Sequence, residues 1–211
     1  MTTQPNDPAT LIDDPADLRA HMGAVNPLAE RKVIDRIDDF CRDFIALSPF
    51  LVLASADGQG RADASPRGDA PGFVEVLDEH TLLIPDRRGN NRVDSFGNIL
   101  ASPGVGLIFM VPGIAETLRV NGRARLSRDP ALLEPATVQE RMPTLGLLVD
   151  VEEAFFHCGK ALIRSKLWDP SVQVERSSFP TLGRIVAEQT KAIGVAEAES
   201  NIAEAYRVRL Y

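Results

Sequence analysis

The spacing of apolar residues predicts a long helix near the start of the chain. Residues 1–25 form a polar lead-in that we expect to be loosely ordered, because Pro, Asp, Asn and Thr are frequent in its first half. Asn26 is then a suitable N-cap, and Pro27 fits the first helical position. We expect Pro49 to end the helix. Apolar residues recur between them at spacings of three and four, the period of one helical face: Val33, Ile37, Phe40, Phe44 and Leu47.

From residue 50 the pattern changes to short apolar runs separated by turn residues, which is typical of β-strands. Residues 50–69 predict a hairpin with its turn at Asp57 and Gly58. Residues 72–85 predict two more strands around Asp78 and Glu79. Three later runs also read as strands, at 105–113, 116–127 and 147–158.

Helices are expected between and after these strands, at 92–101, 159–168 and 195–211. Strands and helices do not alternate regularly, so the order favours an antiparallel sheet over a parallel one. The predicted fold class is therefore mainly β, an antiparallel barrel with flanking helices. We divide the chain into the lead-in, a barrel domain at 26–169, and a partly helical C-terminal extension at 170–211 that packs on the barrel or at a dimer interface.

Composition narrows the classes of function. The chain has 211 residues, 44% of them hydrophobic, which is enough for one core of its own. Its net charge of −7 gives no general attraction to nucleic acid or to an anionic membrane. Two cysteines are too few for a disulfide framework, and no apolar run is long enough to span a bilayer. The start of the chain does not resemble a signal peptide, so we expect a cytoplasmic soluble protein.

One locally basic stretch stands out against this acidic background. "IPDRRGNNRVDSF" begins at Ile84, where a strand is expected to end and a helix to begin. Arginines beside a helix N-terminus supply both the charged donors and the free backbone N–H groups that a phosphate needs. The candidate contacts are Arg88, Asn90, Asn91 and Arg92. A solvated turn, in which the arginines only keep the surface soluble, explains the same pattern.

The second strand of the first hairpin consists of unusually small residues around one arginine. A planar ring can lie against a backbone only where side chains are short, and Ala62, Ala64, Ser65 and Gly68 are short. The Arg67 side chain would then be a second positively charged contact to the same anion. The alternative is that the glycine and the neighbouring prolines only mark a bulge and a turn.

Other familiar chemistry receives little support. The sequence contains neither a P-loop nor a dinucleotide fingerprint. His157 and Cys158 are adjacent, which is poor geometry for two ligands of one metal, and we predict no metal site. Lys160, Arg164 and Trp168 lie four residues apart, so one helical face could present two cations and an indole to an anionic or aromatic substrate. A surface helix with a core tryptophan fits equally.

Taken together, these segments resemble the pyridoxamine 5′-phosphate oxidase-like family of FMN-binding split-barrel proteins. The resemblance extends from the helix before Phe50 to Trp168, and is nearest to an uncharacterised bacterial branch of FMN-dependent enzymes. It rests on the order and spacing of "ASPRGD", "LLIPDRRGNNRVDSFGNIL", "PGVGLIFMVPG", "ETLRVNGRARLS" and "HCGKALIRSKLW".

The resemblance implies a homodimer of six-stranded barrels with FMN at the interface. It makes Asn91 and Arg92 the leading phosphate contacts, with Arg88 and Asn90 in support. Ser65, Arg67 and Ile84 would line the flavin. Thr117 or Arg119 would touch the ring edge from the other subunit, and Lys160, Arg164 and Trp168 would face the substrate.

The chain departs from true pyridoxamine phosphate oxidases near its C-terminus. Those enzymes end in a substrate-clamping pattern near an "RLHDR"-like stretch, whereas this chain has "RSKLWDP" and then a different tail. We therefore expect an FMN-dependent oxidoreductase that acts on another small organic substrate. Two alternatives remain open, a flavin-binding or flavin-storing protein without catalysis, and a haem-handling relative that has lost the flavin site.

Overall fold

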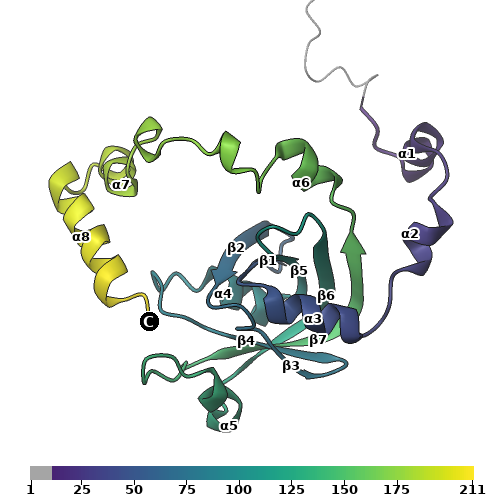
Figure 1. Ribbon diagram of the computed structural model, residues 1–211, viewed down its shortest axis with the longest axis horizontal. Coiled ribbons are helices and arrows are strands. Elements are labelled where there is room, and N and C mark those ends of the chain that lie inside the picture. Colours follow the sequence, from purple (N-terminus) through teal and green to yellow (C-terminus); the bar gives the residue numbers. More distant parts are fainter. Residues whose placement is uncertain (1–10) are drawn as a thin grey trace, which may run out of the picture. The chain divides into compact units, whose positions relative to one another are not determined.

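The computed structural model describes residues 11–211 (Figure 1). The chain divides into two compact units, with the boundary between Val33 and Ile34. In the first unit, α1 (Pro15–Met22) is a helix that the apolar pattern did not indicate within the predicted lead-in. Residues 1–10 of that lead-in lie outside the described residues. The helix α2 (Pro27–Arg31) begins as predicted, with the Asn26 side chain accepting a hydrogen bond from the Leu28 N–H at 2.9 Å.

The prediction of one long helix up to Pro49 is wrong, because the chain after α2 pairs with the sheet. Ile34 exchanges two backbone hydrogen bonds with Ala154, at 3.0 and 2.7 Å. The Ile37 N–H donates to the Glu79 carbonyl at 2.7 Å. These bonds require an extended backbone, so a new helix, α3 (Asp39–Leu47), has to start afterwards, capped by the Asp38 side chain.

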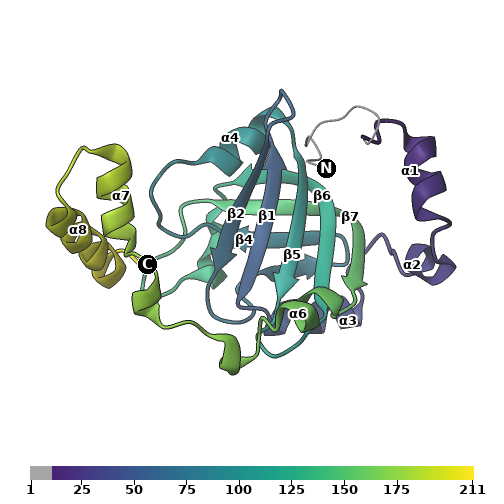
Figure 2. The same cartoon turned by 90° about the horizontal axis from the view of Figure 1, so that it is seen from above.

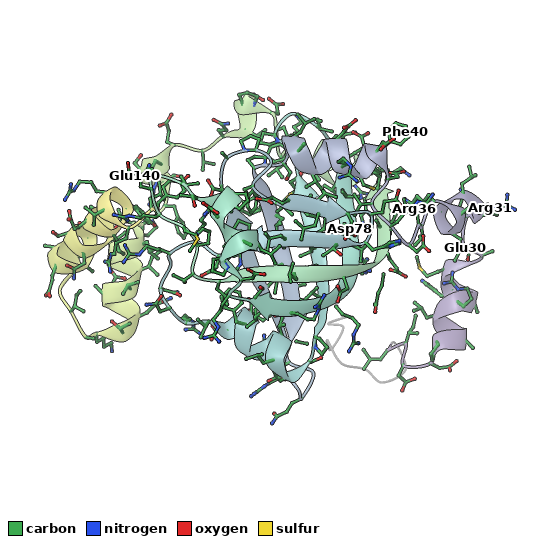
Figure 3. All side chains as sticks on the ribbon, turned by 90° about the horizontal axis from the view of Figure 1, so that it is seen from below. Glu30, Arg31, Arg36, Phe40, Asp78 and Glu140 are labelled. Carbon is green, nitrogen blue, oxygen red and sulfur yellow. The ribbon has the colours of Figure 1, made fainter. Side chains whose placement is uncertain are left out.

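This second start also changes which residues face the core. The buried face of α3 consists of Cys41, Phe44 and Ile45. Phe40, which the predicted stripe placed on the apolar face, is 76% exposed and points away from the sheet (Figure 3). Val33 and Leu47 are exposed as well, and of the five predicted stripe residues only Ile37 and Phe44 are buried.

The second unit is built on one antiparallel sheet of seven strands, in the order β2-β1-β5-β6-β7-β4-β3. The strands are β1 (Phe50–Ala56), β2 (Ala62–Gly68), β3 (Glu75–Asp78), β4 (Thr81–Pro85), β5 (Gly104–Met110), β6 (Thr117–Ser127) and β7 (Gly146–His157). All seven were indicated by the apolar pattern, and the antiparallel arrangement is confirmed.

The six-stranded split barrel is not confirmed in detail. The number six came from the resemblance, whereas the pattern itself contained seven segments. Among the described strands, β2 and β3 end the order and do not pair with each other, so the sheet curves without closing (Figure 1). The extra strand is β3, a four-residue element that pairs with β4 across a bulge.

The core fills the inside of the curved sheet. The helix α3 covers it with Cys41, Phe44 and Ile45, against strand residues such as Leu107 and Val120. The short helix α4 (Asp94–Ala101) packs on β1, β2 and β6 near one end of the strands (Figure 2). Because α4 buries Phe96 and Ile99 there, the loop that leads into it is held beside β2.

Smaller helices follow the sheet. They are α5 (Pro130–Leu133), α6 (Lys160–Ser165), α7 (Leu182–Thr190), α8 (Val195–Val208) and three 3₁₀ turns at Glu134–Ala136, Pro170–Val172 and Arg176–Ser178. The helices predicted near α6 and α8 are confirmed, whereas α7 was not predicted. It packs closely on α8, since a Cβ at Gly183 would lie 2.6 Å from the Glu199 side chain. Within residues 11–211, no helix is both long and apolar enough to cross a membrane.

Candidate functional site

A cleft of the second unit lies between β2, the loop after β4 (the basic loop, residues 86–93) and the start of α4. It encloses about 570 Å³, within the usual range of roughly 300 to 1,000 Å³ for small-molecule sites. Its walls contain the small-residue strand and the whole basic loop that the sequence pointed to. The lining residues are Asp63, Ala64, Ser65, Pro66, Arg67, Gly68, Phe73, Pro85, Asp86, Arg87, Arg88, Gly89, Asn90, Asn91, Arg92, Val93, Asp94, Ser95, Phe96 and Leu210.

The strand β2 presents its polar residues on one face. Alternate side chains of a strand point to opposite sides, so Asp63, Ser65 and Arg67 share a side, and all three are half-buried. Asp63 accepts a hydrogen bond from the Ser95 hydroxyl of α4 at 3.3 Å. Because β2 is an edge strand, α4 and the loop can approach it without competing for its ladder to β1.

Arg67 is held at the centre of this wall, but its hydrogen-bonding capacity is not used up. Its Nη1 donates to the Asp86 carboxylate at 3.0 Å, and its guanidinium carbon lies 5.1 Å from the centre of the Phe96 ring. Its Nε is buried and has no hydrogen-bond partner among the described residues. A buried donor without a partner is costly, so this atom is a natural contact for a bound ligand.

Asp86 is the carboxylate nearest to Arg67. Burial raises the pKa of Asp86 above the ordinary carboxyl value, although the neighbouring Arg67 charge and hydrogen bond oppose the rise. The charged form of Asp86 is therefore poorly solvated in the cleft. Asp86 also partly neutralises the arginine that would meet an anionic ligand.

The other arginines of the cleft differ in what they already contact. Arg87 donates to Asp69 at 2.5 Å and to the Ala136 carbonyl at 2.8 Å, so it has a structural role. Arg92 forms a 2.7 Å ion pair with Asp94, with 72% of its side chain exposed. Arg88 alone among the four cleft arginines makes no hydrogen bond or ion pair with any residue that the structure describes.

The backbone before α4 is bent into the left-handed region at two positions. Asn91 has φ of 57° and Val93 has φ of 53°. Asparagine tolerates this conformation, whereas a β-branched valine there is strained. Val93 is the N-cap of α4, and within residues 11–211 no side chain caps the first turn. The start of α4 therefore lines the cleft with backbone N–H groups that no side chain caps, which is what an anion site uses.

The structure brings together most of the predicted cofactor residues. Ser65, Arg67, Arg88, Asn90, Asn91 and Arg92 all line the cleft. Ile84 does not, because its side chain lies in the core, 3% exposed. Thr117 is buried on β6, and Arg119 donates to Asn121 and lies over the Phe155 ring, so neither belongs to the cleft wall of this chain.

The three predicted substrate residues also lie outside this cleft. Lys160 and Arg164 lie four residues apart on α6 as expected, but the expectation that Trp168 continues their helical face is wrong, because α6 ends at Ser165 and Lys166 has φ of 53°. The Trp168 indole N–H instead donates to the Ile114 carbonyl at 2.8 Å. Arg164 donates to the Lys160 carbonyl on the exposed surface.

Sequence reasoning missed several residues of the site. Asp86 and Arg87 lie inside the basic stretch that begins at Ile84, but the sequence did not show which of its charged residues contact one another. Asp69 and Tyr211 meet at 2.7 Å although they lie 142 positions apart. No local pattern indicates such a contact, and the same holds for Leu210 at the cleft wall.

The described residues form no cluster of metal ligands, and the thiol of Cys41 is buried. No group of three or more His, Cys, Asp and Glu side chains within residues 11–211 converges as metal ligands would. Cys41 lies in the core, where burial raises the pKa of its thiol to about 12. It is therefore a packing residue and not a nucleophile.

Comparisons with known proteins were made for the whole chain. The family model described as pyridoxamine 5′-phosphate oxidase matches residues 37–158, which is more than half of the sequence. Among curated proteins, none matches. The matched residues include β2, the basic loop and α4, and therefore nearly all of the cleft wall.

Three solved structures that are similar to this chain serve as examples. HupZ of Group A Streptococcus is 17% identical, with 57% of this chain and 93% of that chain covered and a TM-score of 0.47. An FMN-binding protein of Syntrophomonas wolfei is 9% identical, with coverages of 68% and 96% and a TM-score of 0.42. HutZ of Vibrio cholerae, a haem storage protein, is 13% identical, with coverages of 58% and 94% and a TM-score of 0.39.

Proposed function

The chain belongs to the pyridoxamine 5′-phosphate oxidase family, and on that premise we propose that it is an FMN-dependent oxidoreductase whose flavin phosphate binds in the cleft beside β2. The proposal rests on one observation: several hydrogen-bond donors without partners within residues 11–211 lie together in this cleft. Arg88 has no partner among the described residues, Arg67 has a buried Nε without one, and α4 begins uncapped.

The cleft fits a phosphorylated planar cofactor in size and chemistry. Its volume of about 570 Å³ suits a molecule of the size of a nucleotide. Alanine, serine and glycine on β2 leave room for a flat ring against the backbone. Forked guanidinium groups and backbone N–H groups are the donors that a phosphate dianion requires.

Each cleft residue then has a distinct part in the proposal. Arg88 and the first N–H groups of α4 bind the phosphate directly. Arg92 joins them only by giving up its ion pair with Asp94, so it contributes less than its position suggests. Arg67 is oriented by Asp86 and Phe96, and its Nε donates to an acceptor atom of the ring or the phosphate chain.

The bound flavin would supply electron and hydride acceptance, and the protein would supply binding, orientation and access. Asp86 keeps a negative charge beside Arg67 and so limits how much positive charge reaches the ligand. The Phe73 and Phe96 rings line the cleft and would shield the bound flavin from water. None of these tasks requires a catalytic acid and base.

The proposal includes a second copy of the chain. Thr117 and Arg119 were expected beside the ring from another subunit, and both lie on β6, outside the cleft of their own chain. A homodimer that brings β6 of one copy to the cleft of the other would satisfy that expectation. Sedimentation of the flavin-loaded protein should show a dimer, and a flavin-loaded monomer at micromolar concentration would contradict this part of the proposal.

The substrate is expected to differ from pyridoxamine 5′-phosphate. That molecule would need a second phosphate clamp beyond the one used for FMN, because a phosphate left unpaired in a cleft is costly. Arg87 is already bound by Asp69, and Lys160 and Arg164 lie outside the cleft wall. With an authentic oxidase as control, FMN-loaded protein should release no pyridoxal phosphate above background. Turnover within about tenfold of that control would contradict the expectation.

The spectrum of the purified protein is the first test of the function itself. A yellow protein that is bleached by NAD(P)H without oxygen, and recovers its colour when air is admitted, supports a redox enzyme. A yellow protein that no reductant of this class bleaches supports flavin storage instead. A colourless protein that does not bind added FMN rejects both flavin functions.

A further inference from the structure

The last two residues of the described chain return to the edge of the cleft. The Tyr211 hydroxyl donates to Asp69 Oδ1 at 2.7 Å, directly after β2. The Arg141 guanidinium donates to the Tyr211 carbonyl. Tyr211 is therefore fixed at both its side chain and its backbone, by partners from two different connections of the sheet.

A third residue, Arg87, contacts the Tyr211 side chain. The guanidinium carbon of Arg87 lies 6.0 Å from the centre of the Tyr211 ring, within reach of a cation–π contact. Arg87 also donates to Asp69 Oδ2, so Arg87, Asp69 and Tyr211 form one closed cluster. Asp69 is almost fully buried in it, with its side chain 2% exposed.

This cluster places the neighbouring residue in the cleft. Leu210 lines the same cavity as Arg67 and the basic loop. It is 63% exposed, so most of its surface is available to a ligand. Leu210 adds an apolar side chain to this lining, and among the described residues it is the one contribution from beyond residue 96.

We infer that Leu210 and Tyr211 form an anchored wall of the cleft, in which Tyr211 is a positioning residue that holds Leu210 against the bound ligand. The wall adds an apolar surface to a cleft whose phosphate end is cationic. It therefore favours a flat, uncharged portion of a ligand over a second anionic group, which has no free cation to meet at that end.

Removal of one atom, the Tyr211 hydroxyl oxygen, should weaken the attachment of the wall. Asp69 also accepts hydrogen bonds from Arg87 and from the Ala70 N–H, so it stays paired when that hydroxyl is removed. A Tyr211→Phe substitution should consequently leave the sheet intact while loosening the chain around Leu210. Tyr206→Phe is a matched control, because Tyr206 lies on α8 with 64% of its surface exposed and outside the cleft lining.

The identity of the ligand in the test rests on the proposed function, but the wall itself does not. Full-length wild type, Tyr211→Phe, Leu210→Ala and Tyr206→Phe are loaded with FMN, and the release rate is followed by stopped-flow fluorescence. We expect Tyr211→Phe to release FMN about threefold to tenfold faster, a change of the size that the net loss of one ordinary hydrogen bond produces. Leu210→Ala should be similarly faster, and Tyr206→Phe unchanged.

A second measurement needs no ligand. Hydrogen–deuterium exchange of peptides covering residues 203–211 should be faster in Tyr211→Phe than in wild type, with Tyr206→Phe equal to wild type. Equal FMN release by Tyr211→Phe and wild type overturns the inference. If wild type binds no FMN, the proposed function fails and the exchange result decides: faster exchange in Tyr211→Phe supports the anchored wall, and equal exchange overturns it.

Discussion

Arg88 and Arg92 flank the same turn of the basic loop, yet they meet an incoming anion in different states. Arg92 is paired with Asp94 at 2.7 Å and its N–H donates to the Asn90 side chain, whereas Arg88 has no partner among the described residues. An anion gains the whole charge-assisted contact from Arg88, but only the difference between two partners from Arg92.

Arg88→Ala should therefore weaken FMN binding more than Arg92→Ala does. A charge-assisted hydrogen bond contributes about 1.5 to 3 kcal/mol, which corresponds to a dissociation constant raised roughly tenfold to a hundredfold for Arg88→Ala. For Arg92→Ala we expect about threefold. Flavin fluorescence titration measures both, with Arg125→Ala as control because Arg125 pairs with Asp150 outside the cleft. Equal losses for Arg88→Ala and Arg92→Ala would contradict this ranking.

Asp86→Asn should strengthen FMN binding, in contrast to the two arginine substitutions. Asparagine keeps an oxygen that can accept the Arg67 hydrogen bond, but it removes a negative charge from the cleft. Burial also raises the pKa of Asp86, so its charged form costs folding energy at neutral pH that asparagine does not. We expect binding roughly twofold to tenfold tighter at pH 7, with no loss of stability. The control is Asp150→Asn, and weaker binding by Asp86→Asn would refute the assigned role.

The residue types of this site were predictable, but their pairing was not. The excess of arginine and asparagine before a helix indicated an anion site and identified Arg88 and Arg92. Which arginine is free depends on where Asp69, Asp86 and Asp94 lie, and that is decided by the fold. The ranking of Arg92 above Arg88 came from the family resemblance, which carries no information about these ion pairs.

At the scale of elements, α4 begins with an unusual residue. Val93 is in the left-handed region with φ of 53°, and 60% of its surface is exposed. A left-handed conformation costs a non-glycine residue roughly 1 to 2 kcal/mol, and asparagine tolerates it better than valine. Strain of this kind persists where the surroundings impose it, and here it lies at the cleft.

Val93→Asn should therefore stabilise the ligand-free protein by about 0.5 to 1 kcal/mol. Urea unfolding monitored by circular dichroism gives the free energy of unfolding. Val174→Asn serves as control, because Val174 is 78% exposed and is not among the left-handed residues. That change should stay within about 0.5 kcal/mol. A less stable Val93→Asn protein would show that the valine side chain contributes more than its conformation costs.

The strands were predictable because alternation and turn residues are local signals. The hairpin of β1 and β2 and the pair of β3 and β4 formed where Asp57–Gly58 and Asp78–Glu79 indicated turns. The helix before them was predicted too long. Ile37 fits the helical stripe, but the backbone hydrogen bonds of Ile34 to Ala154 and of Ile37 to Glu79 join distant segments and override the local preference.

At the scale of the whole second unit, Asp69 joins the end of β2 to the basic loop and to Tyr211. Burial would raise the pKa of this carboxyl, but hydrogen bonds from Tyr211, the Ala70 N–H and Arg87 outweigh it, so the pKa lies below the ordinary value. A carboxyl with a lowered folded pKa contributes stability above its unfolded pKa of about 3.9. That stability is lost as the pH falls through the folded pKa.

Asp69→Asn should accordingly destabilise the protein at pH 6 by about 1 to 3 kcal/mol, and the gap should shrink as the pH falls below about 4. Chemical unfolding of both proteins from pH 6 to pH 3 measures it. Other carboxylates with lowered pKa values, such as Asp57 and Asp78, are present in both proteins, so the difference isolates Asp69. A gap that is independent of pH would mean that Asp69 stabilises by shape and not by charge.

The central claim is that the cleft between β2 and the basic loop binds the phosphate of FMN, and titration of the protein with FMN tests it most directly. Flavin fluorescence should saturate at about one FMN per chain. Inorganic phosphate should compete, and Arg88→Ala should bind more weakly while Arg125→Ala binds like wild type. Absence of saturable binding to the wild-type chain, or equal affinity of Arg88→Ala and wild type, would contradict the claim.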